Sequence, residues 1–137
     1  MTEKIAFDLV APDRLVSSVE VDMVVVPGMD GDFGALKGHA PLISSLRPGL
    51  IEVHNNGRVT ERVFVPGGFA EVNQTRLTIL AEEAENAADL SVAVVRQDLT
   101  NAQEDLADAS DAATKDEAKK RVNALTVKIA VLERVNT

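Results

Sequence analysis

All eight glycines and all five prolines of this 137-residue chain lie at or before Gly68. These two residue types form turns and interrupt helices, so their absence from the second half changes what the chain can build. The alternation of apolar and polar residues that is typical of strands also stops near Ala81. We therefore predict a β domain over residues 1–85 and a helical region over residues 86–137.

The N-terminal part carries several short runs in which apolar and polar residues alternate. The first run, residues 5–10, is followed by Ala11-Pro12-Asp13, so it predicts a strand that ends at a turn. The second run is expected to be a single strand with one apolar face, made of Val19, Val21, Met23 and Val25.

Asn55-Asn56-Gly57 lies between two further alternating runs, residues 51–53 and 59–65. Asparagine and glycine tolerate the positive φ angles that a tight hairpin turn requires. Runs at residues 69–72 and 77–81 are likewise joined by a short polar turn. Closely spaced strands without intervening helices predict an N-terminal antiparallel β-sandwich or flattened barrel.

From Asp89 onward, apolar residues recur at intervals of three and four, the spacing of a helix that packs along one face. A polar break around Ser110-Asp111 divides this pattern, and so short a connection favours an antiparallel two-helix hairpin. We expect Asp89 to cap the first helix, and Thr114 and Glu117 to form a capping box for the second. The predicted seam consists of Val92, Val95, Leu99, Ala102, Leu106 and Ala109 in the first helix, and Ala118, Val122, Leu125, Ile129 and Leu132 in the second.

The composition excludes several classes of protein. Without cysteine the chain has no disulfide and no thiol nucleophile, and an intracellular location is expected. A formal charge of −8 and an aromatic content of 3% argue against nucleic-acid binding, which needs basic side chains and stacking platforms. The longest apolar run, residues 23–27, is far shorter than a membrane helix, and the start does not resemble a signal peptide. Neither export nor direct membrane insertion is expected.

The glycine-rich segment Pro27-Gly-Met-Asp-Gly-Asp-Phe-Gly34 fails as a phosphate or calcium site. A P-loop has Ser or Thr after its lysine, but here Gly38 follows Lys37. A calcium loop needs more acidic ligands and a distal glutamate. We interpret the segment as a structured loop that presents Asp32 and Phe33 to a partner. Packing of Phe33 in the core stays open as the alternative.

The polar residues do not assemble into a catalytic or metal-binding set. His39 and His54 lie 15 residues apart without acidic residues at metal-ligand spacing, and His39 is interpreted as a histidine satisfied within a turn. No nucleophile is paired with an acid or base. We therefore expect no metal, no cofactor and no enzymatic activity.

Several segments together resemble one known family. They are Gly31-Asp-Phe-Gly34, Gly38-His-Ala-Pro-Leu42, Arg47-Pro-Gly49, Pro66-Gly-Gly-Phe-Ala-Glu-Val72 and Leu80-Ala81. On these motifs the chain closely resembles the epsilon subunit of bacterial F-type ATP synthase, the counterpart of the mitochondrial delta subunit. The family's β-sandwich followed by a two-helix hairpin agrees with the elements predicted above.

The resemblance implies a non-catalytic place in the central stalk of the rotor. There the β domain packs on the gamma subunit and touches the polar loops of the membrane c-ring, coupling proton flow to ATP synthesis on other subunits. The implied location is peripheral, at the cytoplasmic face of the bacterial inner membrane. The family's acidic contact with the c-ring falls at Asp32, with Phe33 beside it, and His39 and Pro41 shape the same end of the domain.

The helical half departs from the family in one motif. Family members that bind ATP open the first helix with an aliphatic-Asp-x-x-Arg-Ala motif, whereas this chain has Leu90-Ser-Val-Ala-Val-Val95. Without the carboxylate and the guanidinium the main polar contacts to a nucleotide are lost, so no tight ATP binding is expected. Family hairpins can also reach other subunits, alpha and beta among them, and inhibit ATP hydrolysis. Basic residues on the second helix keep that interpretation open: Lys115, Lys119, Lys120, Arg121 and Lys128.

Two other classes of protein are alternatives to this one. A free-standing regulatory or ligand-binding module, whose hairpin closes over a metabolite, would have the same two parts, and co-purification with gamma would discriminate between them. An enzyme is the weakest alternative, because no acid–base pair can be assembled. The alanine-rich seam also buries little surface, so we expect the hairpin to depend on a partner or on the β domain.

Overall fold

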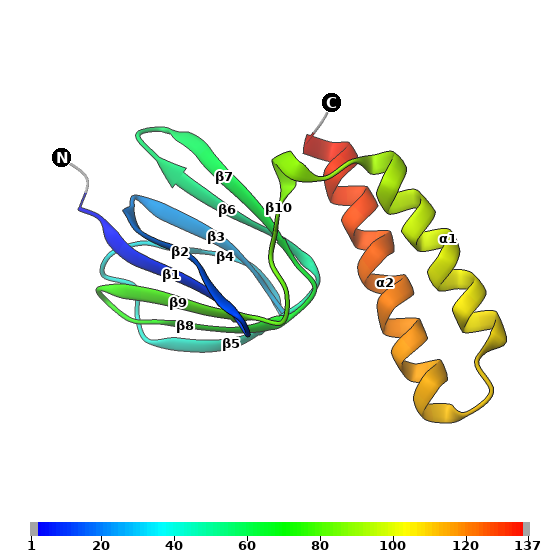
Figure 1. The fold of residues 1–137 in the computed structure, drawn as a ribbon. Coiled ribbons are helices and arrows are strands. Elements are labelled where there is room, and N and C mark those ends of the chain that lie inside the picture. The colour runs from blue at the N-terminus through cyan, green and yellow to red at the C-terminus, as the bar shows by residue number, and fades with distance from the viewer. Residues whose placement is uncertain (1–2, 136–137) are drawn as a thin grey trace. The chain divides into compact units, whose positions relative to one another are not determined.

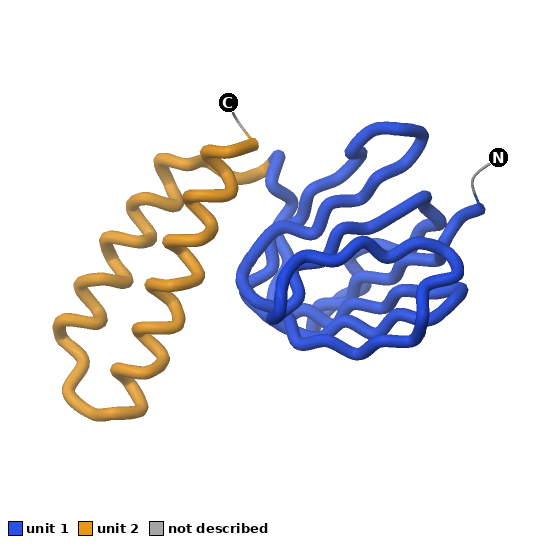
Figure 2. Tube along the Cα trace, turned by 180° about the vertical axis from the view of Figure 1, so that it is seen from behind, with its two compact units in different colours: residues 1–88 blue, residues 89–137 orange. Residues whose placement is uncertain are grey.

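The computed structural model describes residues 3–135 and divides into two compact units, residues 1–88 and residues 89–137 (Figures 1 and 2). The first unit is built of strands and the second of helices. The boundary predicted after residue 85 falls inside a two-residue strand, β10 (Glu85–Asn86). A short 3-10 helix, η1 (Ala87–Asp89), follows, so strand gives way to helix within a few residues.

Among the described residues, the first unit contains ten strands that form one curled sheet (Figure 1). Besides β10 they are β1 (Ile5–Ala11), β2 (Arg14–Val21), β3 (Met23–Gly28), β4 (Gly31–Ala35), β5 (Leu42–Leu46), β6 (Gly49–Asn55), β7 (Arg58–Val65), β8 (Gly68–Val72) and β9 (Arg76–Ala81). Their order is β10-β7-β6-β3-β5-β8-β9-β1-β2, with β4 paired to β3. The predicted sandwich or flattened barrel is confirmed.

One neighbouring pair departs from the antiparallel arrangement. Strand β1 runs parallel to β9, with Ala6 beside Arg76 and Val10 beside Leu80. On its other side β1 pairs antiparallel with β2. Parallel neighbours need a long connection, and here most of the β unit supplies it.

The single strand predicted around Val21 is wrong, because the run contains two strands. Strand β2 ends at Val21 and β3 begins at Met23. Between them, the Asp22 N–H donates to the His54 carbonyl at 3.1 Å and its carboxylate accepts from the Asn56 N–H at 2.8 Å. This interruption changes the inward face, so that Val24 and Val26 of β3 are fully buried, whereas Met23 and Val25 are only partly buried.

The predicted turn at Asn56-Gly57 is confirmed. Strands β6 and β7 pair on either side of it, and the φ angles are 55° at Asn56 and 80° at Gly57. Two consecutive positive φ angles are typical of the two-residue hairpin turn, whose twist matches that of the flanking strands.

The glycine-rich segment interpreted as a loop is instead a hairpin of β3 and β4, paired from Val24 opposite Ala35 to Gly28 opposite Gly31. Glycine and aspartate have low strand propensity, so the sequence of β4 does not by itself indicate a strand. The strand forms because β3 supplies the backbone partners for its hydrogen bonds. Glycine is required at Gly28, where a Cβ would lie 2.9 Å from the Gly31 carbonyl oxygen. Strand β5 was also not predicted.

The core of the first unit lies on the inner face of the curled sheet. Residues from strands far apart in the sequence meet there with at most 1% of their surface exposed, among them Ile5, Phe7, Leu9, Ile51, Val65, Leu77 and Ile79. Each large apolar side chain buried in this way contributes about 1.5–3 kcal/mol.

The second unit is an antiparallel pair of helices, α1 (Val92–Asp108) and α2 (Ala112–Val135), which pack against each other (Figure 1). An ion pair joins them, with the Arg96 guanidinium 2.8 Å from the Glu133 carboxylate. Each position of the predicted seam is at least partly buried, and the most deeply buried are Val95, Ala102, Leu125, Ile129 and Leu132.

Both predicted helix caps are wrong. Helix α1 is capped by Ser91, whose hydroxyl accepts from the Val94 N–H at 3.4 Å, because η1 occupies the residues up to Asp89. Helix α2 is capped by Asp111, whose carboxylate accepts from the Thr114 N–H at 2.8 Å and its hydroxyl at 2.9 Å. These hydrogen bonds, first that from the Thr114 backbone, hold the pKa of the Asp111 carboxyl below its ordinary value. Thr114 thus donates to the cap instead of being the cap.

Candidate interaction surfaces

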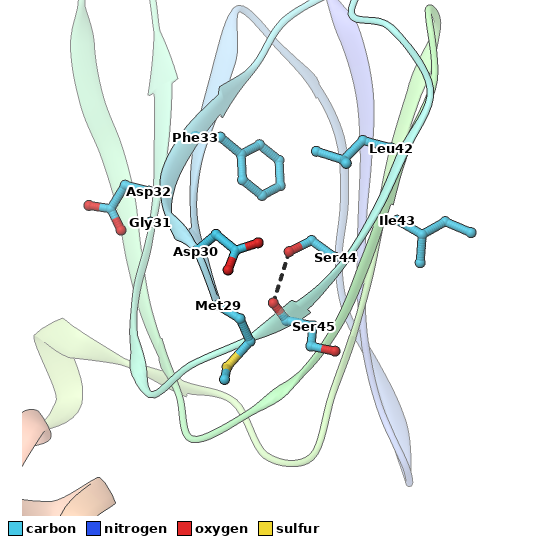
Figure 3. A pocket seen from close by; sticks show the side chains of 9 residues that line it. All are labelled: Met29, Asp30, Gly31, Asp32, Phe33, Leu42, Ile43, Ser44 and Ser45. Carbon is cyan, nitrogen blue, oxygen red and sulfur yellow. Dashed lines mark hydrogen bonds between the residues drawn. The ribbon is translucent and has the colours of Figure 1, made fainter.

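The hairpin of β3 and β4 ends in a tip, residues 28–32, in which Gly28 is buried and the other four residues are exposed. Phe33 follows the tip on β4. Neighbouring residues of a strand point to opposite faces. Asp32 accordingly points outward and Phe33 inward, toward Leu42 (Figure 3). Asp32 and Phe33, which were predicted to face a partner together, therefore lie on opposite faces of β4.

Phe33 packs against the core, and its presentation to a partner stays a prediction. It is partly buried, and it also lines a groove on the surface. Its ring centroid lies 6.1 Å from that of His39, with the ring planes inclined at 47°. This contact joins β4 to the segment that follows it, and the family resemblance assigned both to the same end of the domain.

His39 is held within a turn, as predicted. Its backbone N–H donates to the Leu36 carbonyl at 3.1 Å. The ring Nδ1 lies 2.5 Å from the Ala40 carbonyl oxygen, and because that oxygen can only accept, Nδ1 is the donor. The preceding residue, Gly38, donates its N–H to the Gln74 carbonyl at 2.7 Å. Pro41 is exposed. The segment is thus fixed by backbone hydrogen bonds, and it offers Pro41 to the solvent.

A shallow groove of about 460 Å³ lies between β4 and β5 (Figure 3). The Asp30 carboxylate points into it, while the Asp32 carboxylate points away. Its lining combines acidic, hydroxyl and apolar side chains, from Met29, Asp30, Asp32, Phe33, Leu42, Ile43, Ser44 and Ser45 together with Gly31. Such an open, mixed lining suits contact with another protein better than enclosure of a small molecule.

The guanidinium of Arg47 contacts the tip at two points. One amino group donates to the Gly28 carbonyl at 2.6 Å and the other to the Asp32 carboxylate at 2.6 Å. Sequence reasoning assigned no role to Arg47. The only local signal was its place before Pro48-Gly49, which indicates a turn and says nothing about what its side chain reaches.

An apolar row crosses the outer face of the sheet. Leu15, Val10, Leu80 and Phe69 are successive cross-strand neighbours on β2, β1, β9 and β8. Leu15, Leu80 and Phe69 are 62%, 54% and 58% exposed, and Ile43 of β5, diagonal to Phe69, is 73% exposed. We call these five residues the outer apolar row. A contiguous exposed apolar patch of this kind marks a site of protein contact.

Neither a metal centre nor a membrane-spanning segment is found in the described part of the chain. Over residues 3–135, no three His, Asp or Glu side chains are grouped so that they could hold a metal ion. No helix within the same residues is long and apolar enough to cross a membrane.

The fold and these surfaces define a class of small two-part protein, in which a β-sandwich with exposed contact surfaces is followed by a helical hairpin. Residues 4–87 match the family described as ATP synthase, Delta/Epsilon chain, beta-sandwich domain. This match covers more than half of the chain, and relatives extend the likeness into the helices. The chain belongs to the epsilon chain family of ATP synthase.

Two relatives show how far the likeness extends. The chain is 52% identical over 118 residues to the ATP synthase epsilon chain of Rhodospirillum rubrum, covering 86% of this chain and 88% of that one. It is 51% identical over 111 residues to the epsilon chain of Parvibaculum lavamentivorans, covering 81% and 84%.

Solved structures share the fold at lower sequence identity. A chain of the mitochondrial ATP synthase of Euglena gracilis, in an OSCP/F1/c-ring assembly, superposes with a TM-score of 0.79 at 22% identity, covering 100% of this chain and 84% of that chain. A chain of the central stalk and c-ring of the Tetrahymena thermophila enzyme superposes with a TM-score of 0.70 at 14% identity, covering 96% and 98%. The arrangement of a β-sandwich before a helical hairpin is therefore shared with these chains.

Proposed function

We propose that the chain is a non-catalytic rotor subunit of the central stalk, which links gamma to the c-ring and couples proton flow to ATP synthesis. The observation that carries this proposal is the 52% identity to an epsilon chain over 86% of the sequence. The fold it shares with chains from central-stalk and c-ring assemblies supports the same placement. Such a subunit would lie peripherally, at the cytoplasmic face of the bacterial inner membrane.

The tip between β3 and β4 is the surface that we assign to the polar loops of the c-ring. It is exposed, and it carries two carboxylates, Asp30 and Asp32, that could accept hydrogen bonds from a partner's polar groups. Phe33 and His39 support the tip from the inner side of β4, while Pro41 belongs to the exposed segment beyond them. We therefore give Asp32 the contact itself, and Phe33 a supporting part.

The outer apolar row is the surface that we assign to gamma. Leu15, Phe69, Leu80 and Ile43 expose more than half of their surface to solvent, which is unfavourable unless a partner covers them. An apolar face of this kind suits a lasting contact between subunits that turn together.

Charge reversal at the tip tests the assignment to the c-ring. We expect Asp32→Arg to weaken assembly with the c-ring by at least about tenfold, because it repels Arg47 and removes an acceptor. Asp13→Arg, at the exposed turn between β1 and β2, is the matched control. Binding to ATP synthase from which this subunit has been removed is the measurement. Equal binding of wild type and Asp32→Arg would contradict the assignment.

We also infer that the hairpin does not hold ATP tightly. The residues that open α1 carry no carboxylate and guanidinium in the family's nucleotide-binding pattern, and Ser91 is used as the helix cap. Isothermal titration of the full chain with ATP should show no saturable heat at submillimolar concentration. A saturating isotherm in that range would show that other residues form a nucleotide site.

The regulatory part of the proposal concerns α2. This helix would contact alpha or beta subunits, and ATP hydrolysis would be inhibited through that contact.

A further inference from the structure

The tip between β3 and β4 is tied to the end of β5, and to Arg47 just beyond it, by backbone and side-chain hydrogen bonds. The Arg47 N–H donates to the Pro27 carbonyl at 3.0 Å, and the Met29 N–H donates to the Ser45 carbonyl at 2.9 Å. To these bonds Arg47 adds its two side-chain contacts at 2.6 Å, with the Gly28 carbonyl and the Asp32 carboxylate. One residue thus contacts both ends of the tip.

The planar guanidinium suits this arrangement. Its amino groups donate in fixed directions, so a single side chain can satisfy a backbone carbonyl and a carboxylate at once, whereas a lysine ammonium is a flexible point charge. The Arg47 side chain is 39% exposed and the Asp32 side chain 60%. The pair is therefore partly screened by water, and we expect its main effect on conformation, with a small effect on global stability.

We propose that Arg47 is a positioning residue for the tip, holding residues 28–32 in the conformation that meets the partner before the partner binds. The inference rests on the proposed contact of the tip with the c-ring. A preformed tip loses less conformational entropy on binding, so its affinity is higher than that of the same residues on a mobile turn. In this arrangement the Asp32 carboxylate is already paired, and a partner's donor has to share it with Arg47.

Three variants of the full chain separate positioning from other roles. Arg47→Ala removes both contacts, and Arg47→Lys keeps the charge but loses the planar fork. Arg62→Ala is the matched control, because Arg62 is 38% exposed and pairs with Glu52 at 3.0 Å on β6 and β7, away from the tip. Amide hydrogen exchange of the free chain reports the tip directly, and binding to ATP synthase lacking this subunit reports its consequence.

In Arg47→Ala we expect exchange of the amides at residues 28–32 to accelerate by about tenfold, as hydrogen bonds to a charged donor are lost, with core strands β1 and β9 unchanged. Affinity should fall by about three- to tenfold. Arg47→Lys should be intermediate in both measurements, and Arg62→Ala should resemble wild type in both.

Unchanged tip exchange in Arg47→Ala would overturn the proposal, because the turn would then hold its conformation without the arginine. If binding were weaker in that case, Arg47 would contact the partner itself. Failure of the c-ring assignment is recognised separately, by equal binding of wild type and Asp32→Arg, while the exchange measurement on the free chain still tests whether Arg47 orders the tip.

Discussion

The β unit and the helical unit differ in how far neighbouring residues in the sequence determine which side chains are buried. In the helices, each apolar position spaced by three and four is at least partly buried. In the β unit, alternation indicated most strands but not which face is inward: Phe7 is almost fully buried, whereas Leu80 is 54% exposed. A helix therefore defines its own apolar face, whereas a strand acquires one from neighbours that are distant in the sequence.

The largest effect should come from the long-range core. Phe7→Ala is expected to lower the free energy of unfolding by about 3–5 kcal/mol, because the side chain is 1% exposed and its removal leaves a cavity. Ala102→Gly, at a buried position of α1, should lower it by about 1 kcal/mol through helix propensity. Denaturant unfolding of both variants makes the comparison. Equal losses would contradict the expectation that the long-range core has the larger effect.

A substitution in the outer apolar row should have a smaller effect, on the affinity for gamma. Changing Leu80 to Ser should weaken the contact with gamma by about tenfold. Full burial of a leucine contributes about 1.5–3 kcal/mol, and about half of the Leu80 surface, 54%, is left for a partner to cover. Val94→Ser is the matched control, because Val94 is 60% exposed on α1. Pull-down or titration with gamma is the measurement. A Leu80→Ser chain that binds gamma like wild type would remove the row from the interface.

The smallest effect should be a pH dependence of the helical unit. The pKa of Asp111 is lowered from its ordinary value of 3.8, first by the Thr114 backbone hydrogen bond. A lowered folded-state pKa stabilises the folded form above the unfolded-state pKa, and this stability is lost as the pH falls through the folded-state value. Helical circular dichroism should therefore lose an acid-dependent component below about pH 3.8 that Asp111→Asn lacks. Asp108→Asn, at the end of α1, should keep it.

The features that the sequence predicted are those encoded by neighbouring residues. The turn at Asn56-Gly57 needs only the φ angles of two residues, and the helical seam only a spacing. Strand β4 was not predicted, because its glycines and aspartate have low strand propensity and the strand depends on pairing with β3. The caps were misplaced because the choice between Asp111 and Thr114 depends on where the chain leaves α1.

The grouping of the candidate site's residues was predicted in part, and their contact with a partner stays a prediction. The sequence singled out Asp32, Phe33, His39 and Pro41, and the structure places Phe33 beside His39 but turns Asp32 to the opposite face of β4. The contact of Arg47 with Asp32 has no local signal, because fifteen residues separate them and only the folding of β5 alongside the tip brings them together. The outer apolar row likewise consists of residues from strands that only folding brings together, so its exposed side chains could not be distinguished from core side chains in the sequence.

The parallel pairing of β1 with β9 has a consequence for synthesis on the ribosome. Residues 5–11 leave the ribosome about seventy residues before their partner, Arg76–Ala81, which makes this contact among the slowest to form. Until then β1 has an open edge that could pair with another chain. The β unit can therefore complete its sheet only when its last long strand has emerged, and a chain truncated before residue 76 should aggregate.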